Sequence, residues 1–176
     1  MTTNVRGDSR VLGRLRAAGG KGIVRIEDRF AAEVGDLWSA LTDPGRLAHW
    51  LGEVEGDLRV GGEFRARFFA SGWQGTGRVE ACDPEQRILV LTKDADEPES
   101  PDEHAIEITL TRDGDERILA WEERGMPPEL VAAYGAGVQI HVEDLAAYLA
   151  GGVRCDPDTR WAELFPAYQR LADDLI

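Results

Sequence analysis

Apolar residues keep one helical period in the stretch Pro128–Ala150, PELVAAYGAGVQIHVEDLAAYLA, the longest such run in the chain. The positions that share a face follow one another at steps of three or four residues, about one turn. They are Leu130, Tyr134, Val138, Val142 (or His141), Leu145 and Leu149. The polar residues expected to stay in water are Glu129, Gln139, Glu143 and Asp144. The prolines before this stretch and Gly151-Gly152 after it suit the two ends of a helix. The pattern predicts one long helix whose apolar face lies across a sheet.

Most of the chain before this helix alternates apolar and polar residues, which is typical of strands with one wet face. The predicted strands are Arg10–Arg16, Ile23–Phe30, Phe64–Phe68, Trp73–Ala81, Arg87–Thr92, His104–Arg112 and Arg117–Arg124. Glycines in AAGGKG predict a hairpin between the first two strands, and DGDE predicts the turn between the last two. These segments indicate an antiparallel arrangement.

Two short helices are predicted between the first hairpin and the later strands. Val34–Leu41 switches to helical spacing. Asp43 followed by Pro44 then suits the N-cap and the first position of a second helix.

The end of the chain, Asp156–Ile176, is again helical in pattern. Its apolar residues are Trp161, Leu164, Phe165, Tyr168, Leu171 and Leu175. Pro166 interrupts the run, and because proline lacks the amide hydrogen that a helix interior needs, we predict a turn or two, a kink and a second piece. This tail is expected to pack onto the domain, and a homodimer contact is the alternative.

The 176 residues are expected to form a single domain of the α+β class. Within it, residues 1–22 are expected to form a basic N-terminal hairpin extension with a frayed start at Met1–Ser9, residues 23–150 the core, and residues 151–176 a helical tail.

Charge and composition exclude several classes of partner. The formal net charge of −13 argues against nucleic acid and against an anionic membrane surface. No apolar run approaches the ~20 residues that cross a bilayer, and the N-terminus lacks the apolar core of a signal peptide. Two cysteines are too few for a disulfide scaffold, so a cytoplasmic location is expected. The basic residues of 1–22 and the acidic residues of 94–103 are interpreted as solvated, and docking of the basic start onto a second copy is the alternative.

No motif in the sequence defines a reaction. Ser71 lies in ASG, a turn rather than a nucleophile elbow, and no phosphate-binding or dinucleotide loop is present. The histidines His49, His104 and His141 lie far apart and lack metal-ligand spacing. We therefore expect neither a metal nor a cofactor.

Three motifs in order resemble the activator-of-Hsp90-ATPase-like (AHSA1-like) group of the START/Bet v 1 superfamily. Leu37–Arg65 reads LWSALTDPGRLAHWLGEVEGDLRVGGEFR, Gly75–Glu85 reads GTGRVEACDPE, and Gly125–Pro127 leads into the long helix. The resemblance covers Ile23–Ala150. It implies a helix-grip fold, in which a curved antiparallel sheet wraps the long C-terminal helix and a cavity for an apolar molecule lies between them.

On this resemblance the expected cavity wall consists of inward-facing and mostly aromatic residues. They are Trp38, Phe64, Phe68, Trp73, Trp121, Tyr134, Val138, His141 and Leu145. Family members often carry tryptophan just after the glycine of the last helix. Here Gly137 is followed by Val138, which is expected to widen or reshape the cavity.

Two polar residues are candidates for chemistry. Glu123 continues the alternation of Leu119 and Trp121, and a carboxyl group in an apolar pocket has a raised pKa and can act as an acid or base. We nevertheless expect the strand to end at Arg124 and Glu123 to be solvated. His141 could donate to a ligand, but a half-buried position at the helix edge is the preferred interpretation.

The sequence therefore favours binding of a small hydrophobic ligand, aromatic or lipid-like, over catalysis. The resemblance implies two alternatives. One is a polyketide cyclase or aromatase-like enzyme that uses Glu123 and His141, and the other is an Hsp90-type co-chaperone.

Overall fold

The structure is a computed structural model, and it describes residues 10–97, 99 and 103–175. The predicted frayed start, Met1–Ser9, lies outside the described residues, as does part of the acidic segment 94–103. Among the described residues, no helix combines the length and apolarity that a membrane crossing requires.

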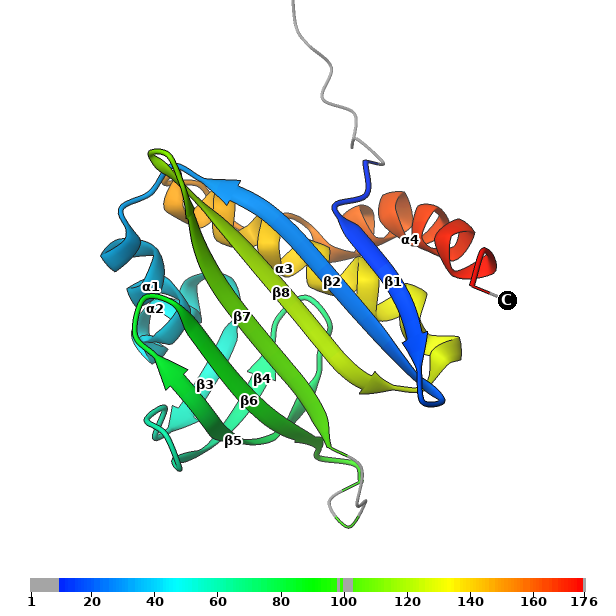
Figure 1. Cartoon of the computed structure of the whole chain (residues 1–176), viewed down its shortest axis with the longest axis horizontal. Helices are drawn as coiled ribbons and strands as arrows, with labels where there is room; N and C mark the ends of the chain where they lie inside the picture. The colour runs from blue at the N-terminus through cyan, green and yellow to red at the C-terminus, as the bar shows by residue number, and fades with distance from the viewer. Residues whose placement is uncertain (1–9, 98, 100–102, 176) are drawn as a thin grey trace, which may run out of the picture.

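The strands of the described residues form one antiparallel sheet of eight, in the order β1-β2-β8-β7-β6-β5-β4-β3. Their bounds are β1 Gly13–Ala18, β2 Lys21–Phe30, β3 Gly52–Gly56, β4 Glu63–Phe68, β5 Gln74–Asp83, β6 Arg87–Asp94, β7 His104–Asp113 and β8 Glu116–Met126. The sheet bends, so that β3, β4 and β5 curl back while β8, β2 and β1 stand in front of the helices (Figure 1). The α+β class and the helix-grip arrangement are confirmed.

The predicted hairpin at the start of the chain is present as β1 and β2. Its turn is Gly19-Gly20, with φ of +59° and +76°. A two-residue turn with positive φ at both positions matches the twist of the flanking strands, and glycine adopts it without steric penalty. Both strands therefore run up to the turn.

The two short predicted helices are α1 (Val34–Thr42) and α2 (Pro44–Trp50). Asp43 caps α2 as predicted, because its Oδ1 accepts a hydrogen bond of 2.9 Å from the backbone N–H of Gly45. Trp50 of α2 links the two helices, because its Nε1 donates a hydrogen bond to the backbone oxygen of Ala40 in α1.

Strand β8 is longer than its pattern predicted. It runs to Met126 because β2 pairs with it on one side and β7 on the other, with Gly22 opposite Met126 and Ala105 opposite Arg124. A strand held on both edges continues its alternation, so the predicted end at Arg124 was wrong.

The long helix begins as a 3-10 turn, Pro128–Leu130, and continues as α3, Val131–Leu149. The prediction that Gln139 and Asp144 stay in water was wrong, since they are 1% and 2% exposed. The reason is α4 (Pro157–Asp173), which packs along α3 and also contacts β1 (Figure 1).

Two of the buried polar residues of α3, Gln139 and Asp144, form hydrogen bonds with the terminal segments. Gln139 Oε1 accepts hydrogen bonds from the hydroxyl of Tyr168 (2.5 Å) and from the N–H of Leu12 (3.0 Å). Asp144 Oδ1 accepts from the N–H of Cys155 (2.9 Å). These bonds fasten both extensions onto α3 and satisfy groups whose burial would otherwise be unfavourable.

The predicted break at Pro166 does not occur. The helix α4 continues through Pro166 to Asp173. Proline removes one backbone hydrogen bond of a helix, and the burial of Leu164, Ala167 and Tyr168 around it stabilises the helical conformation in compensation.

We predict opposite effects for two alanine substitutions in α3. A Cβ on Gly135 would lie 2.5 Å from Cδ1 of Tyr168, whereas a Cβ on Gly137 would meet no described atom within 4 Å. Both variants gain helix propensity, so Gly137→Ala should stabilise the protein by up to about 1 kcal/mol, while the collision should make Gly135→Ala destabilising by about 1–3 kcal/mol. Urea unfolding of both variants measures the difference, and equal free energies of unfolding would contradict the packing described here.

Candidate functional site

A cavity of about 530 Å³ lies between the concave face of the sheet and α3. Strands β4, β6, β7 and β8 form its sheet side, α3 forms the opposite wall, and the β4–β5 loop and the first turns of α4 border it. Its lining residues are Phe68, Ala70, Ser71, Gly72, Trp73, Thr92, His104, Ile106, Glu123, Ala133, Tyr134, Gly137, Val138, His141, Pro157, Asp158 and Trp161.

Glu123 provides a buried carboxyl group in this cavity. Strand pairing places it directly between Val24 of β2 and Ile106 of β7, and it is 6% exposed. The expectation that it is solvated was therefore wrong, because the strand does not end there. Its Oε1 accepts a hydrogen bond of 3.2 Å from Nε1 of Trp121, two residues earlier on the same face. Burial between aliphatic neighbours raises the pKa of Glu123 to about 7.

His141 lies on the helix wall and is 3% exposed, not half-buried as expected. Its ring stacks on Trp121, with centroids 5.8 Å apart, and meets Phe68 edge-on at 5.3 Å. Burial lowers the pKa of His141 to about 4, so the ring is neutral at neutral pH. Its Nδ1 is a buried polar atom without a hydrogen-bond partner among the described residues. Such an atom is available to a ligand.

A second polar pair joins β7 to α3. The hydroxyl of Tyr134 lies 3.4 Å from Nδ1 of His104, and the two rings meet edge-on with centroids 5.4 Å apart. Burial and the nearby carboxylate of Glu123 raise the pKa of Tyr134. His104 was not among the predicted wall residues, although it continues the alternation of Ile106 and Ile108 that predicted the inner face of β7.

Aromatic side chains form the rest of the wall. Phe68 and Trp73 pack with ring centroids 4.9 Å apart, and Nε1 of Trp73 donates to Oδ1 of Asp94 at 2.6 Å. Trp161 reaches the cavity from α4, where it stacks on Phe165. Its helical spacing predicted a packed tail, and nothing in the sequence placed that tail at the cavity.

Five of the nine predicted wall residues line the cavity: Phe68, Trp73, Tyr134, Val138 and His141. The other four are not among its lining residues. Trp121 and Leu145 are buried in the hydrophobic core, and Trp121 meets Trp50 edge-on. Phe64 covers Gly77, where a Cβ would lie 2.2 Å from its ring, and Trp38 of α1 packs against the core.

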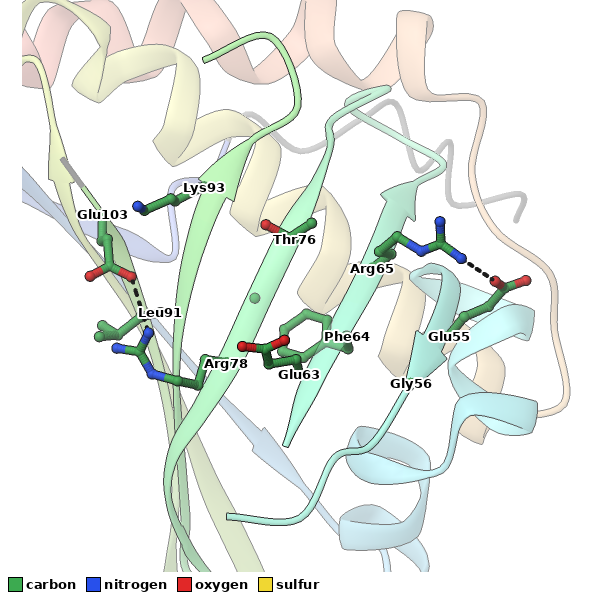
Figure 2. Close-up of a pocket in the computed structure, with 11 residues that line it drawn as sticks. Glu55, Gly56, Glu63, Phe64, Arg65, Thr76, Arg78, Leu91, Lys93 and Glu103 are labelled. Atoms are coloured by element: carbon green, nitrogen blue, oxygen red, sulfur yellow. Dashed lines mark ion pairs between the residues drawn. The ribbon is translucent and has the colours of Figure 1, made fainter. Parts of the chain in front are cut away.

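A hollow of about 600 Å³ at the other face of the sheet has a different character (Figure 2). Its charged side chains come from β3 to β6 and from Glu103, just before β7. They include the ion pairs Arg65–Glu55 at 3.6 Å and Arg78–Glu103 at 3.8 Å. Exposed ion pairs of this kind hold their charges in water and contribute little binding energy. The inner cavity is therefore the candidate site.

The fold places the protein in the Bet v 1-like class, with an antiparallel sheet bent around a long helix and a cavity between them. The sequence profile of the family described as activator of Hsp90 ATPase homolog 1-like proteins matches residues 31–150. The chain belongs to this family, and the resemblance seen in the sequence is confirmed.

Solved structures share the fold. The crystal structure of CalU16 from Micromonospora echinospora has a TM-score of 0.74 and 24% identity, over 93% of this chain and 97% of CalU16. DynU16, a protein in the dynemicin biosynthetic locus, has a TM-score of 0.67 and 28% identity over 76% of this chain, but only 50% of DynU16 is covered. PFC0360w, an HSP90 activator from Plasmodium falciparum, has a TM-score of 0.60 and 19% identity over 73% of this chain and 96% of that protein. No curated protein matches the sequence significantly.

We predict that the two buried groups have opposite effects on stability as pH changes. Between pH 4.5 and about 7, Glu123 is protonated in the folded protein but ionised in the unfolded chain. Its contribution to stability therefore falls as pH rises through this range. Between about pH 4 and 6.5, His141 is neutral in the folded protein but protonated in the unfolded chain. Its contribution to stability therefore falls as pH decreases through this range.

Replacing Glu123 separates the two effects. Each pH unit between the folded and unfolded pKa values changes the free energy of unfolding by about 1.4 kcal/mol. The free energy of unfolding of Glu123→Gln, relative to that of the wild type, should therefore rise by up to about 3 kcal/mol between pH 4.5 and pH 8. Urea unfolding at several pH values measures this gain. The control is Glu129→Gln, which removes an exposed carboxylate and should follow the wild type. A constant offset between Glu123→Gln and the wild type would show that Glu123 does not titrate in this range.

Proposed function

We propose that this protein binds a small hydrophobic ligand, aromatic or lipid-like, in the cavity between the sheet and α3, without carrying out a defined reaction. The observation that carries the proposal is the cavity itself, about 530 Å³ in volume with walls of Phe68, Trp73, Tyr134 and Val138. Cavities of about 300–1,000 Å³ with mainly apolar walls and a few polar groups are the usual form of small-molecule sites.

Gly137 supports the proposal from the helix side. It lines the cavity, and the space next to it is open, because a Cβ added at this position would meet no described atom within 4 Å. A helix interior disfavours glycine by about 1 kcal/mol relative to alanine. Gly137 thus lowers the stability of the helix and leaves the space beside it open as part of the cavity.

We predict that filling this space prevents binding without unfolding the protein. Gly137→Leu should project a side chain into the cavity and weaken binding of the neutral fluorescent probe N-phenyl-1-naphthylamine by at least about tenfold. Gly137→Ala is the matched control, since it changes the helix equally and occupies little of the cavity. Probe fluorescence and native mass spectrometry measure the binding, and equal affinities for the two variants would place the probe elsewhere. An absence of binding by the wild type would refute the proposed site.

A cyclase-type reaction is the second candidate, and the burial of Glu123 in the cavity is the observation that favours it. As a carboxylate, Glu123 could take a proton from a methylene between two carbonyl groups. The carbanion would attack a ketone carbon of the same chain, and the alkoxide would take the proton back. The location of DynU16 in a biosynthetic locus is consistent with such a role.

This reaction can be tested with a synthetic poly-β-ketone thioester. If Glu123 is the base, Glu123→Gln should lower the rate of ring closure by at least about 100-fold. Glu122→Gln is the control, because Glu122 lies on the opposite face of β8, where it pairs with Arg25 and Arg124. Product formation is followed by mass spectrometry, and an unchanged rate in Glu123→Gln would exclude Glu123 as the base.

A further inference from the structure

The charged lining of the cavity has one sign. Glu123 lies buried between sheet and helix, and the exposed Asp158 lies on the first turn of α4. Within the described part of the chain, no lysine or arginine lines the cavity. Lys93 and Arg78 belong to the hollow at the other face of the sheet, where acidic side chains accompany them.

The neutral polar groups of the lining add hydrogen-bond acceptors. Nδ1 of His141 has no partner among the described residues and can accept in one of its two neutral tautomers. The hydroxyl of Thr92 lies 3.5 Å from the backbone oxygen of His104 and keeps lone pairs of its own. Glu123 receives a single hydrogen bond within the described chain, from Trp121, so one carboxylate oxygen is left for a donor.

We infer that the ligand of this cavity is an aromatic or otherwise apolar amine whose ammonium group lies against Glu123 while its apolar body lies among the aromatic walls. This inference rests on the proposed function and names the ligand class for the same site.

Electrostatic interactions favour an amine over an anionic or a neutral ligand. An anionic ligand would bring a second negative charge next to a buried carboxylate, and no cationic side chain of the lining is present to compensate. A neutral ligand would leave Glu123 with the desolvation that raises its pKa to about 7. An ammonium group offers three donors to a carboxylate that has one partner, and charge-assisted hydrogen bonds of this kind are the strong ones.

The aromatic walls favour the same charge. Phe68, Trp73, Tyr134 and Trp161 border the cavity on different sides. The faces of aromatic rings attract cations, most strongly where water is excluded. Asp94, which accepts the hydrogen bond from Nε1 of Trp73, adds negative charge at the edge of one of these rings.

Three ligands of equal shape test the inference: 2-naphthylmethylamine, 2-naphthalenemethanol and 2-naphthoic acid. Isothermal titration calorimetry with the full chain at pH 7 should give the amine at least a tenfold higher affinity than the alcohol. The acid should bind at least tenfold more weakly than the alcohol. Equal binding of amine and alcohol would overturn the inference and leave the proposed function intact, whereas failure of all three ligands and of the neutral probe would overturn both.

Two glutamine variants locate the source of the preference. Glu123→Gln should bring the affinity of the amine to within threefold of that of the alcohol while the alcohol still binds. Glu122→Gln removes the same charge from the next residue of β8, on the opposite face of the sheet, and should keep the tenfold preference. A preference that persists in Glu123→Gln, or that disappears equally in both variants, would show that the general negative field of the protein causes it and would overturn the assignment to Glu123.

Discussion

The indole of Trp121 connects the elements on which the site depends. It lies on β8, donates its N–H to Glu123, stacks on His141 of α3 and meets Trp50 of α2 edge-on. A single buried side chain thus contacts two polar residues of the cavity, Glu123 and His141, and holds them in place. Because Trp121 is itself 1% exposed, it fixes these groups without taking up room in the cavity. Rings locked by packing on several sides give a site its defined geometry.

Several residues that line the cavity lower the stability of the folded protein. Among the described residues, Glu123 has no cationic partner and Nδ1 of His141 has no hydrogen-bond partner, and Gly137 lies within a helix. Each of these features is unfavourable in a folded protein. All three belong to the same cavity. Elsewhere the buried polar groups of α3 are paired, as Gln139 and Asp144 show. Unfavourable features gathered in one place are typical of a binding or catalytic site.

Membership of the family fixes the fold more firmly than the function. The matched range, 31–150, contains β3 to β8 and α3, but neither β1 nor α4. Yet α4 supplies Pro157, Asp158 and Trp161 to the cavity, and the superposition on CalU16 extends over 93% of this chain. The chemistry of the site therefore depends partly on a segment beyond the shared core, and function has to be argued from the side chains.

The elements and their faces follow from local patterns in the sequence. Alternation in β4, β7 and β8, the turn at Gly19-Gly20 and the cap at Asp43 are local features, because each depends on residues that are close in the chain. Alternation in β4 predicted the inward face of Phe68, and helical spacing predicted the face of α3 that carries Tyr134.

What each face meets depends on contacts between segments that are distant in the chain. The second face of α3 is buried because α4 covers it, and Glu123 is buried because β2 and β7 both pair with β8 as far as Arg124. Neither contact leaves a local signal, since the partners lie up to about a hundred residues away in the sequence. The cavity lining likewise comes from seven segments of the chain that the fold brings together, and its two carboxyl groups, Glu123 and Asp158, come from β8 and α4.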